Sequence, residues 1–442
     1  MLILSLLARD LRAQDLERSL ASPTEAGLAG AGVVAARGAE ALWINPAGIP
    51  SSRWHVITAL GVQHAERTVQ LTAGEVNAPA PEARDLSGVD LAPSAALSVP
   101  LGRSGVSLAL GYRTGLLTSS EYQTDGHPLR YLTSQLALRQ HIVSLGAAFR
   151  WRWLALGAAL EMSHLRLEVT RSMWAGLEAD RDQLQDPQLD LTATFDGDDG
   201  VTVTGVFGLR LSPTRWLQLG LALRPPVTAA LSGTLGLTAA PDPRPPEGYD
   251  AIDARGSPAR LDLGLPLELR GGVTFRPRSW VAIHLESRHR RWSAPLTLVA
   301  DGADVVLTTG NQRAPYPVVR IPLSIAASDD TSLHIGLELP RLLGLLTVRA
   351  GYAYHTATTP ADLPSAVTLE LDRHVLGLGL EARRGRLRIG AALQRSLRQT
   401  LTSESERAVI VNPLDPSVTE RAGRGRFTSN ATRALFSVGL VL

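Results

Sequence analysis

One segment of this sequence alternates strictly between apolar and other side chains. From Leu261 the chain reads L-D-L-G-L-P-L-E-L-R-G-G-V-T-F, and its large apolar residues share one parity. A helix cannot place such a set on one face, whereas a strand can, because its side chains repeat every two residues. The segment from Val281 repeats the pattern, as do many others. The sequence therefore predicts an all-β protein.

The spacing of the alternating segments predicts how the strands are arranged. About fourteen strands are expected, at residues 54–64, 92–101, 105–114, 134–149, 153–169, 201–211, 216–228, 259–276, 279–292, 321–339, 345–355, 367–383, 386–401 and 426–442. Short turns alternate with long loops at 65–91, 115–133, 170–200, 229–258, 293–320, 356–366 and 402–425. This alternation is typical of a transmembrane antiparallel β-barrel of the bacterial outer membrane, with both termini in the periplasm.

Two of the expected strands change parity part-way along their length. The changes lie near Ser163 and near His374. A β-bulge inserts one extra residue into a strand and would shift the parity in this way. We therefore expect a bulge at each of these two positions.

Composition excludes several other classes of protein. The chain has 442 residues, 44% of them hydrophobic, which is too apolar for a disordered chain. Its mean hydropathy is only +0.04, and no run approaches the roughly 18–20 apolar residues of a membrane-spanning helix. It has no Cys, which excludes thiol catalysis and Cys-based zinc sites. It also has no Lys, and its Arg residues are scattered rather than clustered as in a nucleic-acid binder.

The aromatic residues support the barrel interpretation. Five tryptophans fall at strand ends that join short turns: Trp54, Trp151, Trp153, Trp216 and Trp280. Four further aromatics fall at the opposite ends: Tyr112, Trp292, Tyr352 and Tyr354. Trp and Tyr favour membrane interfaces, where an apolar ring can keep its polar group in water. A soluble secreted β-protein, the alternative fold, predicts no such sorting.

Residues of the opposite parity are small, polar or charged and would line the lumen. The candidates on two neighbouring strands are Glu268, Arg270, His284 and Glu286. A soluble β-sandwich core would not accept such a row, whereas a wet or paired lumen does. The two glutamates could face each other across adjacent strands, with Arg270 and Arg288 near enough to neutralise them.

The N-terminal residues do not alternate. Residues 1–14 contain a short apolar core and are interpreted as a signal-peptide remnant, the alternative being the first turn of an amphipathic helix. Residues 15–52 are rich in Gly and Ala. A segment of this length at the periplasmic end could fold into the lumen as a plug, or hatch. The expected division is therefore a hatch at 15–52 and an outer-membrane barrel at 53–442.

Four parts of the chain resemble the FadL/TodX family of outer-membrane transporters for hydrophobic compounds. They are the segment closing in Asn45-Pro46-Ala47-Gly48; Gly208-Leu-Arg-Leu-Ser-Pro213 with the run Trp216 to Val227; Leu265-Pro266 through Pro277 with Trp280 and Trp292; and Arg349-Ala-Gly-Tyr-Ala-Tyr354 with Asp372 to Gly379. The resemblance implies a monomeric fourteen-stranded barrel plugged by an N-terminal hatch. It also implies ligand capture between two external loops, movement of the hatch, and a kink in the third strand that opens a lateral gap.

Few residues can be assigned a role from this resemblance. Asn45, Pro46, Ala47 and Gly48 match the hatch motif. The third external loop offers apolar candidates for ligand capture: Met173, Trp174, Leu177 and Leu184. Exposed apolar side chains in such a loop indicate contact with a hydrophobic molecule. The alternative is a loop that packs on its own small core. Gly111, the one glycine of interior parity in the third strand, is the candidate for the kink.

Other motifs are weak. Gly30-Ala-Gly32 lacks the preceding strand of a dinucleotide-binding unit. Asp196 to Gly200 resembles part of a calcium loop but lacks its bidentate Glu, so a solvated loop tip is preferred. Arg288 to Trp292 could contact lipopolysaccharide phosphates or form a plain solvated strand end. We expect no catalytic residues, no metal site, no cofactor and no nucleic-acid partner.

The sequence thus favours a monomeric outer-membrane transporter for passive uptake of hydrophobic small molecules, long-chain fatty acids or similar, with lateral exit. Its expected partners are the hydrophobic ligand, outer-membrane lipid and lipopolysaccharide. The alternative is a non-transporting outer-membrane barrel that anchors or assists secreted proteins.

Overall fold

The computed structural model describes residues 20–73, 78–102, 104–124, 126–184, 186–292, 296–323, 325, 327–404, 407–415, 417 and 420–442. The signal-peptide remnant proposed at 1–14 and the first residues of the proposed hatch, 15–19, lie outside the described residues. None of the helices in the described part is long and apolar enough to cross a membrane.

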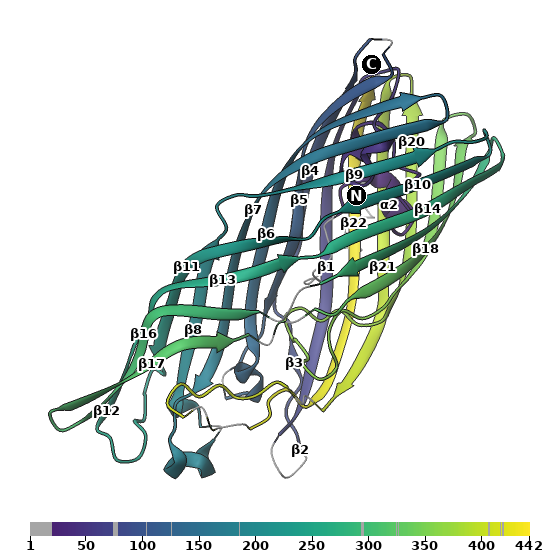
Figure 1. Ribbon diagram of the computed structural model, residues 1–442. Helices are drawn as coiled ribbons and strands as arrows, with labels where there is room; N and C mark the ends of the chain where they lie inside the picture. Colours follow the sequence, from purple (N-terminus) through teal and green to yellow (C-terminus); the bar gives the residue numbers. More distant parts are fainter. Residues whose placement is uncertain are drawn as a thin grey trace.

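Within the described residues, fourteen strands close into an antiparallel barrel, as the alternation predicted (Figure 1). They are β1 (His55–Ala73), β4 (Asp90–Pro100), β5 (Val106–Glu121), β6 (Thr133–Trp151), β7 (Leu154–Trp174), β9 (Thr202–Leu211), β10 (Leu217–Arg224), β14 (Leu267–Arg278), β15 (Val281–Arg291), β18 (Asp330–Leu342), β19 (Leu346–His355), β20 (Arg373–Arg384), β21 (Leu387–Ser403) and β22 (Gly425–Val441). Strand β22 pairs with β1 from Val441–His55 to Gly425–Leu71, which closes the ring. The predicted fold class is confirmed.

The expected long loops contain strands of their own. These are β2 (Ala78–Pro79), β3 (Ala83–Arg84), β8 (Asp190–Asp198), β11 (Val227–Ala239), β12 (Ala251–Arg255), β13 (Ser257–Leu265), β16 (Thr297–Thr309) and β17 (Gln312–Pro322). Strand β8 pairs with both β7 and β11, and β13 pairs with both β11 and β16. These pairings prolong one side of the wall beyond the barrel, at the lower left of Figure 1.

Two expected strands are each divided in two by proline. Pro225 and Pro226 separate β10 from β11, and Pro266 separates β13 from β14. Proline has no backbone N–H for the sheet ladder, so pairing changes partner at these residues. Strand β10 pairs with β9 and β14, whereas β11 pairs with β8 and β13. The continuous strands predicted at 216–228 and 259–276 are therefore wrong in this respect.

The bulge expected near His374 is wrong, because β20 keeps regular register with β19 through this residue. Near Ser163, β7 keeps regular register with β6, but on its other side the register shifts by one residue, between Ser163 opposite Thr202 of β9 and Arg166 opposite Asp198 of β8. The apolar face of β7 also changes here. Its outward side chains are apolar up to Met162 and polar from His164, while the inward ones, except Arg171, are apolar from Leu165 onward. This reversal marks where the strand leaves the membrane.

The aromatic residues mark both membrane boundaries. All five tryptophans predicted at the short-turn end are solvent-exposed on the outer face, by 45–62%. At the opposite end, the hydroxyl groups of Tyr112 and Tyr352 lie 2.7 Å from the Nδ1 atoms of His141 and His374 respectively. Trp292 differs from expectation, because its indole N–H donates to Asp330 and its ring packs on apolar residues inside the barrel.

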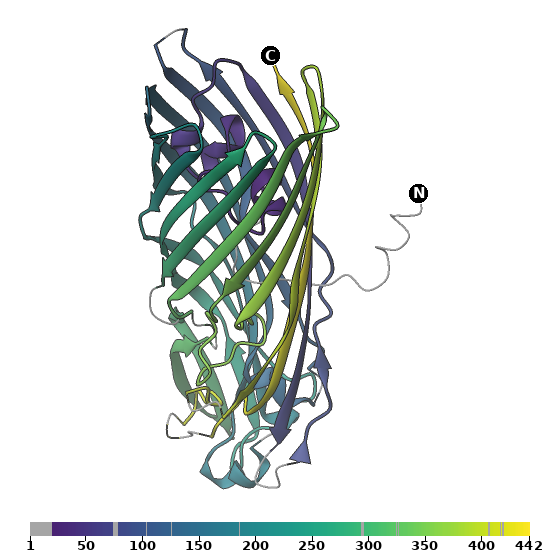
Figure 2. The ribbon, with the colours of Figure 1, turned by 90° about the vertical axis from the view of Figure 1, so that its right-hand side faces the viewer.

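The described part of the expected hatch, residues 20–52, lies inside the barrel near the short-turn end (Figures 1 and 2). We call residues 20–52 the hatch. It contains α2 (Pro23–Gly27) and two short 3₁₀ helices, η1 (Gly38–Trp43) and η2 (Pro46–Gly48). It is short of regular structure because glycine and proline recur along it, and these residues build tight turns and interrupt helices.

Glycines of the barrel wall let the hatch approach the strand backbones. A Cβ atom on Gly157 would lie 2.3 Å from the carbonyl carbon of Pro46, and one on Gly351 would lie 2.2 Å from that of Leu28. Further wall glycines face hatch atoms in the same way: Gly111, Gly146, Gly208, Gly220, Gly272, Gly336, Gly377 and Gly379. A side chain at these positions would occupy the space that the hatch fills.

Candidate functional site

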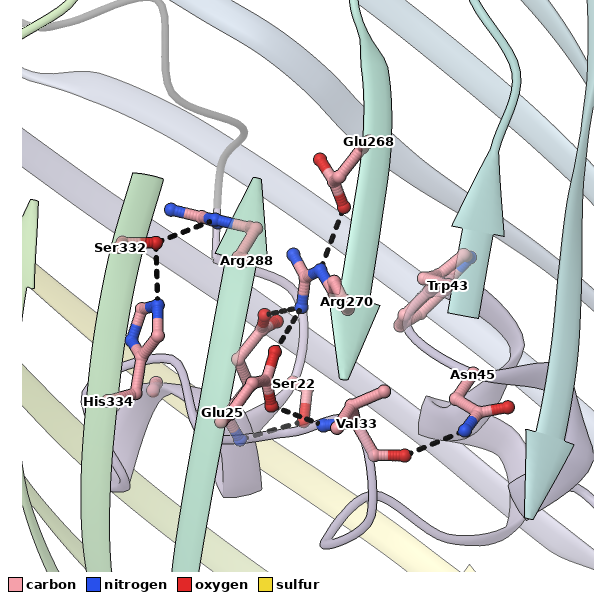
Figure 3. A network of polar contacts seen from close by, with 12 residues as sticks. Ser22, Glu25, Val33, Trp43, Asn45, Glu268, Arg270, Arg288, Ser332 and His334 are labelled. Carbon is pink, nitrogen blue, oxygen red and sulfur yellow. Dashed lines mark hydrogen bonds and ion pairs between the residues drawn. The ribbon is translucent and has the colours of Figure 1, made fainter. Parts of the chain in front are cut away.

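Three of the four lumen residues predicted from parity form one ionic network with the hatch (Figure 3). Arg270 of β14 lies 2.6 Å from Glu25 of α2, 2.7 Å from Glu268 and 3.7 Å from Glu286 of β15. All of these side chains are nearly buried. One guanidinium thus neutralises carboxylates from two strands and the hatch. Removing one partner of a buried ion pair leaves an uncompensated charge, so Arg270 holds the hatch to the wall.

The network continues to the hatch motif. Glu286 accepts a 2.7 Å hydrogen bond from the backbone N–H of Val33, and Asn45 donates from its Nδ2 to the carbonyl of Val33 at 2.8 Å. The other amide atom of Asn45, Oδ1, accepts from the N–H of Ala47 at 3.1 Å and so caps η2. Pro46 occupies the first turn of η2, where its missing N–H removes no hydrogen bond.

The last residue of the motif, Gly48, has room for no side chain, because a Cβ atom there would lie 2.6 Å from the carbonyl oxygen of Ala36. The motif is thus a compact turn. The amide of Asn45 joins two parts of the hatch, and Gly208 of the wall leaves space for its Oδ1.

His284 does not join this network. Its Nδ1 lies 2.8 Å from the Thr274 hydroxyl, on the side of the hatch toward the short turns. The glutamates do not face each other as the sequence suggested, because Glu268 is opposite Arg290 and Glu286 is opposite Gly272. Arg270 nevertheless lies close to both.

Several ionic contacts at the same level could not be assigned from the sequence. Glu161 of β7 contacts Arg113 of β5 at 3.3 Å and also Arg224 of β10, which donates to the carbonyl of Trp43 in the hatch. Arg349 of β19 binds Glu338 at 2.8 Å and Glu381 at 3.1 Å. In the sequence these residues are recognisable only as charged residues of interior parity. Parity predicts that such a side chain lies in the lumen, but it does not predict which oppositely charged residue it will contact.

The polar contacts surround only a small cavity. It lies between the hatch and the wall, lined by Glu25, Arg270, His334 and Gln394 among others, and has room for a few waters, about 40 Å³. His334 contacts the carbonyl of Ala29 through Nδ1, at 2.7 Å. The hatch therefore fills the inner half of the lumen.

The outer half of the lumen has the opposite chemistry. It holds an apolar cluster from the inward faces of the strands and from the long connections, which we call the outer apolar cluster. Its members include Leu116, Tyr131, Leu138, Leu167, Met173, Trp174, Phe195, Leu231, Leu261, Leu298, Leu369 and Phe427. Small-molecule sites are lined predominantly by apolar and aromatic side chains, which is the composition of this cluster.

The four predicted capture residues all meet this cluster. Met173 and Trp174, at the end of β7, are fully buried in it. Leu177 and Leu184, on either side of the 3₁₀ helix η4 (Glu178–Gln183), are partly buried and pack on its edge. The loop therefore does not pack on a small core of its own, because its apolar residues extend the core of the lumen.

The third barrel strand, β5, is irregular four residues beyond the predicted kink. Gly111 pairs regularly with Ala96 and Ser144, whereas the register against β6 shifts between Thr114 and Leu117. The pairing of β5 with β4 ends at Arg113, which is opposite Ser94. The two segments are then joined by side chains, with the Ser119 hydroxyl 3.1 Å from both Asp90 oxygens.

The remaining motifs are occupied by structural contacts. Asp196 pairs with Arg166 at 2.6 Å, and Asp198 accepts from the N–H of Gly200 at 2.9 Å, as expected of a loop tip. Within the described residues no group of three or more His, Asp or Glu could hold a metal ion. The basic run does not form one patch, because Arg288 and Arg290 are buried in the lumen and only the residues between and after them face outward.

The model of the outer membrane protein transport family (OMPP1/FadL/TodX) matches residues 12–422. The chain belongs to this family. It is therefore an outer-membrane protein, with its short turns and the hatch toward the periplasm and its long connections outside.

Solved structures show the same fold at low sequence identity. A FadL homologue of Pseudomonas aeruginosa is 16% identical, with a TM-score of 0.75 over 96% of this chain and 99% of that one. The toluene transporter TodX of P. putida is 16% identical, with a TM-score of 0.68 over 97% and 99%. The toluene transporter TbuX of Ralstonia pickettii is 16% identical, with a TM-score of 0.63 over 95% and 97%. Among proteins with curated descriptions, none matches the sequence.

Proposed function

We propose that this protein carries hydrophobic small molecules, long-chain fatty acids or similar compounds, passively across the outer membrane. The observation that carries the proposal is the outer apolar cluster, which joins the inward faces of the strands to apolar residues of the external loops. Burying apolar surface stabilises a ligand by about 25 cal/mol per Å², so an apolar molecule gains free energy by leaving water for this region. The solved relatives described as toluene transporters are consistent with a ligand of this class.

Ligand capture is assigned to the loop after β7. Leu177 and Leu184 are only partly buried and offer an apolar surface at the mouth of the cluster. Met173 and Trp174 lie deeper and continue the same surface inward. A ligand would pass from the first pair to the second without crossing a polar layer.

Lateral exit is supported by the irregularity in β5. Leu116 belongs to the outer apolar cluster, whereas the next residue, Leu117, lines a groove on the outer wall together with Asp90 and Ser119. Between Thr114 and Ser120 the wall is closed against β4 by side chains rather than by a backbone ladder, so this stretch can open without breaking β-sheet hydrogen bonds. The stretch begins at the level of His141, so a ligand leaving there would enter the outer edge of the lipid. We therefore move the proposed kink from Gly111 to Gly115, which precedes Leu116. The hatch would close the direct route to the periplasm.

The head group of the ligand is suggested by Arg171. This residue of β7 is buried beside the outer apolar cluster, and it donates to the carbonyls of Pro322, Tyr131 and Val409. Within the described residues it has no carboxylate at ion-pair distance. A charged guanidinium held by neutral carbonyls would gain from a carboxylate nearby, which favours a fatty acid over a neutral hydrocarbon.

Uptake into proteoliposomes tests both parts of this proposal. Vesicles with the protein should take up labelled palmitate and labelled toluene faster than empty vesicles. Arg171→Gln should slow palmitate more than toluene, whereas the control Arg255→Gln, at an exposed position of β12, should slow neither. Equal rates for empty and loaded vesicles with both probes would contradict transport, and equal slowing of both probes by Arg171→Gln would contradict the head-group assignment.

The oligomeric state and the lipid contacts complete the proposal. We expect a monomer whose outer aromatic rim, including Tyr112 and Tyr352, lies in the lipopolysaccharide layer. The match to a family of transport proteins favours transport over the alternative role in anchoring or assisting secreted proteins.

A further inference from the structure

Four arginines gather on the periplasmic side of the hatch. Arg37 belongs to the hatch, at the start of η1, and Arg150, Arg210 and Arg276 belong to β6, β9 and β14 of the wall. Three of them donate to one atom, Oε1 of Gln218 in β10, from Arg37 at 2.7 Å, Arg210 at 2.9 Å and Arg276 at 3.2 Å. A single neutral amide oxygen is thus the shared acceptor of three cations.

Carboxylates do not balance this cluster within the described part of the chain. The only carboxylate that acts appreciably on Arg37 is Glu338, which is itself bound to Arg349 at 2.8 Å. Burial, and then the positive charges of Arg276 and Arg150, lower the pKa of Arg37 to about 10, so it stays charged at neutral pH. The cluster therefore differs from the network around Arg270, where each cation meets acids.

One guanidinium group is left with an unused donor. Arg210 is only 3% exposed, and its Nη1 has no hydrogen-bond partner. A buried donor without a partner destabilises the folded state, and more so when it is charged. Repulsion between like charges adds to this cost. Both penalties would be removed by one group that carries negative charge and several acceptor oxygens.

We propose that Arg37, Arg150, Arg210 and Arg276 bind a compact oxyanion between the hatch and the barrel wall. Guanidinium groups bind phosphate and carboxylate oxygens through short, charge-assisted hydrogen bonds. Because Arg37 comes from the hatch and the others from the wall, the bound anion links the two. Its loss leaves four positive charges at the junction, which favours movement of the hatch. Anion binding would therefore control how firmly the hatch is seated.

Thermal unfolding of the purified full-length protein in detergent tests this inference. Inorganic phosphate and acetate are titrated separately at constant ionic strength, with sodium chloride as the reference salt. Phosphate should raise the unfolding midpoint saturably by a few degrees, because a ligand that binds only the folded state stabilises it. Acetate reports whether a carboxylate, such as the head group of a transported acid, can serve instead of a phosphate group.

Two variants and a control make the test specific. Arg210→Gln should abolish the saturable shift, whereas Arg152→Gln should keep it, since Arg152 lies at the same end but stacks on the Trp151 ring. Gln218→Glu places a carboxylate at the junction and should raise the midpoint without phosphate while removing the response to it. Single-channel conductance should show fewer openings with phosphate than with chloride.

The outcomes separate clearly. A saturable shift with either anion that depends on Arg210 supports the site and identifies its chemistry. Equal shifts for the native protein and Arg210→Gln, or a response of Gln218→Glu identical to that of the native protein, would overturn it. The inference does not rest on the proposed ligand, because the unfolding assay requires no transport.

Discussion

The two halves of the lumen are built from the same strands but have opposite chemistry. In the inner half, inward residues of β7 are small or charged, such as Ala159 and Glu161, and they face the hatch. In the outer half, inward residues of the same strand are Leu165 and Leu167, and they form an apolar cluster. The outward side chains change in the opposite direction, from apolar in the inner half to polar in the outer half. The lumen is therefore polar where lipid surrounds the wall and apolar where water does.

This difference explains how the protein can be stable and still bind hydrophobic molecules. Where the outer face of the wall meets lipid, the inner face can be polar because its carboxylates are paired with arginines of the wall and its polar groups contact the hatch. Where the outer face meets water, the inner face must supply the apolar core that holds the strands together. That core is also the part of the molecule to which a hydrophobic ligand can bind.

Removing the central cation of the inner half should have the largest effect. Arg270→Met leaves Glu25, Glu268 and Glu286 buried without their shared partner, and losing one partner of a buried ion pair costs about 3–5 kcal/mol. We expect a displaced hatch, seen as increased conductance in planar bilayers and a lower unfolding midpoint. Arg166→Met, in an exposed pair, is the control and should change neither. An unaltered conductance for Arg270→Met would show that the network does not hold the hatch.

The membrane boundary can be located with two alanines on one face of β6. Both Ala147 and Ala137 are exposed on the outer face. Ala147→Arg places a charge in lipid and should cost about 2–4 kcal/mol near the midplane. Ala137→Arg lies beyond the reversal, opposite Glu168, and should change stability little. Folding titrations into lipid vesicles measure both, and similar costs for the two variants would argue against a boundary near His141.

Filling one wall glycine should loosen the hatch by a smaller amount. Gly157→Ala pushes on the backbone of Pro46 and Ala47, and overpacking of this kind typically costs about 1–3 kcal/mol. Gly271→Ala is the control, because its Cβ would meet only a Leu221 carbon at 3.8 Å. Limited proteolysis of the hatch should be faster for the first variant alone. Equal proteolysis rates for the two variants would mean that the hatch accommodates the added methyl group without becoming less stable.

The smallest expected effect is a dependence on pH. Burial raises the pKa of the Glu40 carboxyl, which accepts hydrogen bonds from Ser22 at 2.6 Å and Thr24 at 2.8 Å. Arg349 opposes this rise and Glu381 adds to it. A raised pKa in the folded hatch means that its contribution to stability is present at acidic pH and is lost as pH rises through that pKa.

Conductance from pH 4 to 8 tests this dependence. The native protein should open more often at higher pH, and Glu40→Gln should flatten the profile because its amide keeps an acceptor oxygen but cannot ionise. Parallel profiles for the two proteins would assign the titration to another group.

The periodic features could be predicted from the sequence because they are local. Alternation located the fourteen barrel strands, and the positions of the tryptophans located the periplasmic boundary. Parity also placed Glu268, Arg270 and Glu286 in the lumen. These inferences need only neighbouring residues and the two-residue repeat of a strand.

The errors arose where a local pattern depends on its surroundings. The change of parity near His374 was interpreted as a bulge because the apolar face was assumed to point outward along the whole segment. The prolines at 225, 226 and 266 were visible, but not the change of sheet partner that they cause. Contacts such as Glu25 with Arg270 join residues 245 positions apart, and no periodicity predicts them.

The closure of the ring between β1 and β22 has a consequence for assembly. Strand β1 begins a few residues after the hatch, and its partner β22 is the last strand of the barrel in chain order. Until β22 is added, β1 has a free edge able to pair with another chain. The hatch precedes every barrel strand in the chain, yet the compartment that holds it is completed only by β22. Loss of β22 would therefore leave the hatch without an enclosure.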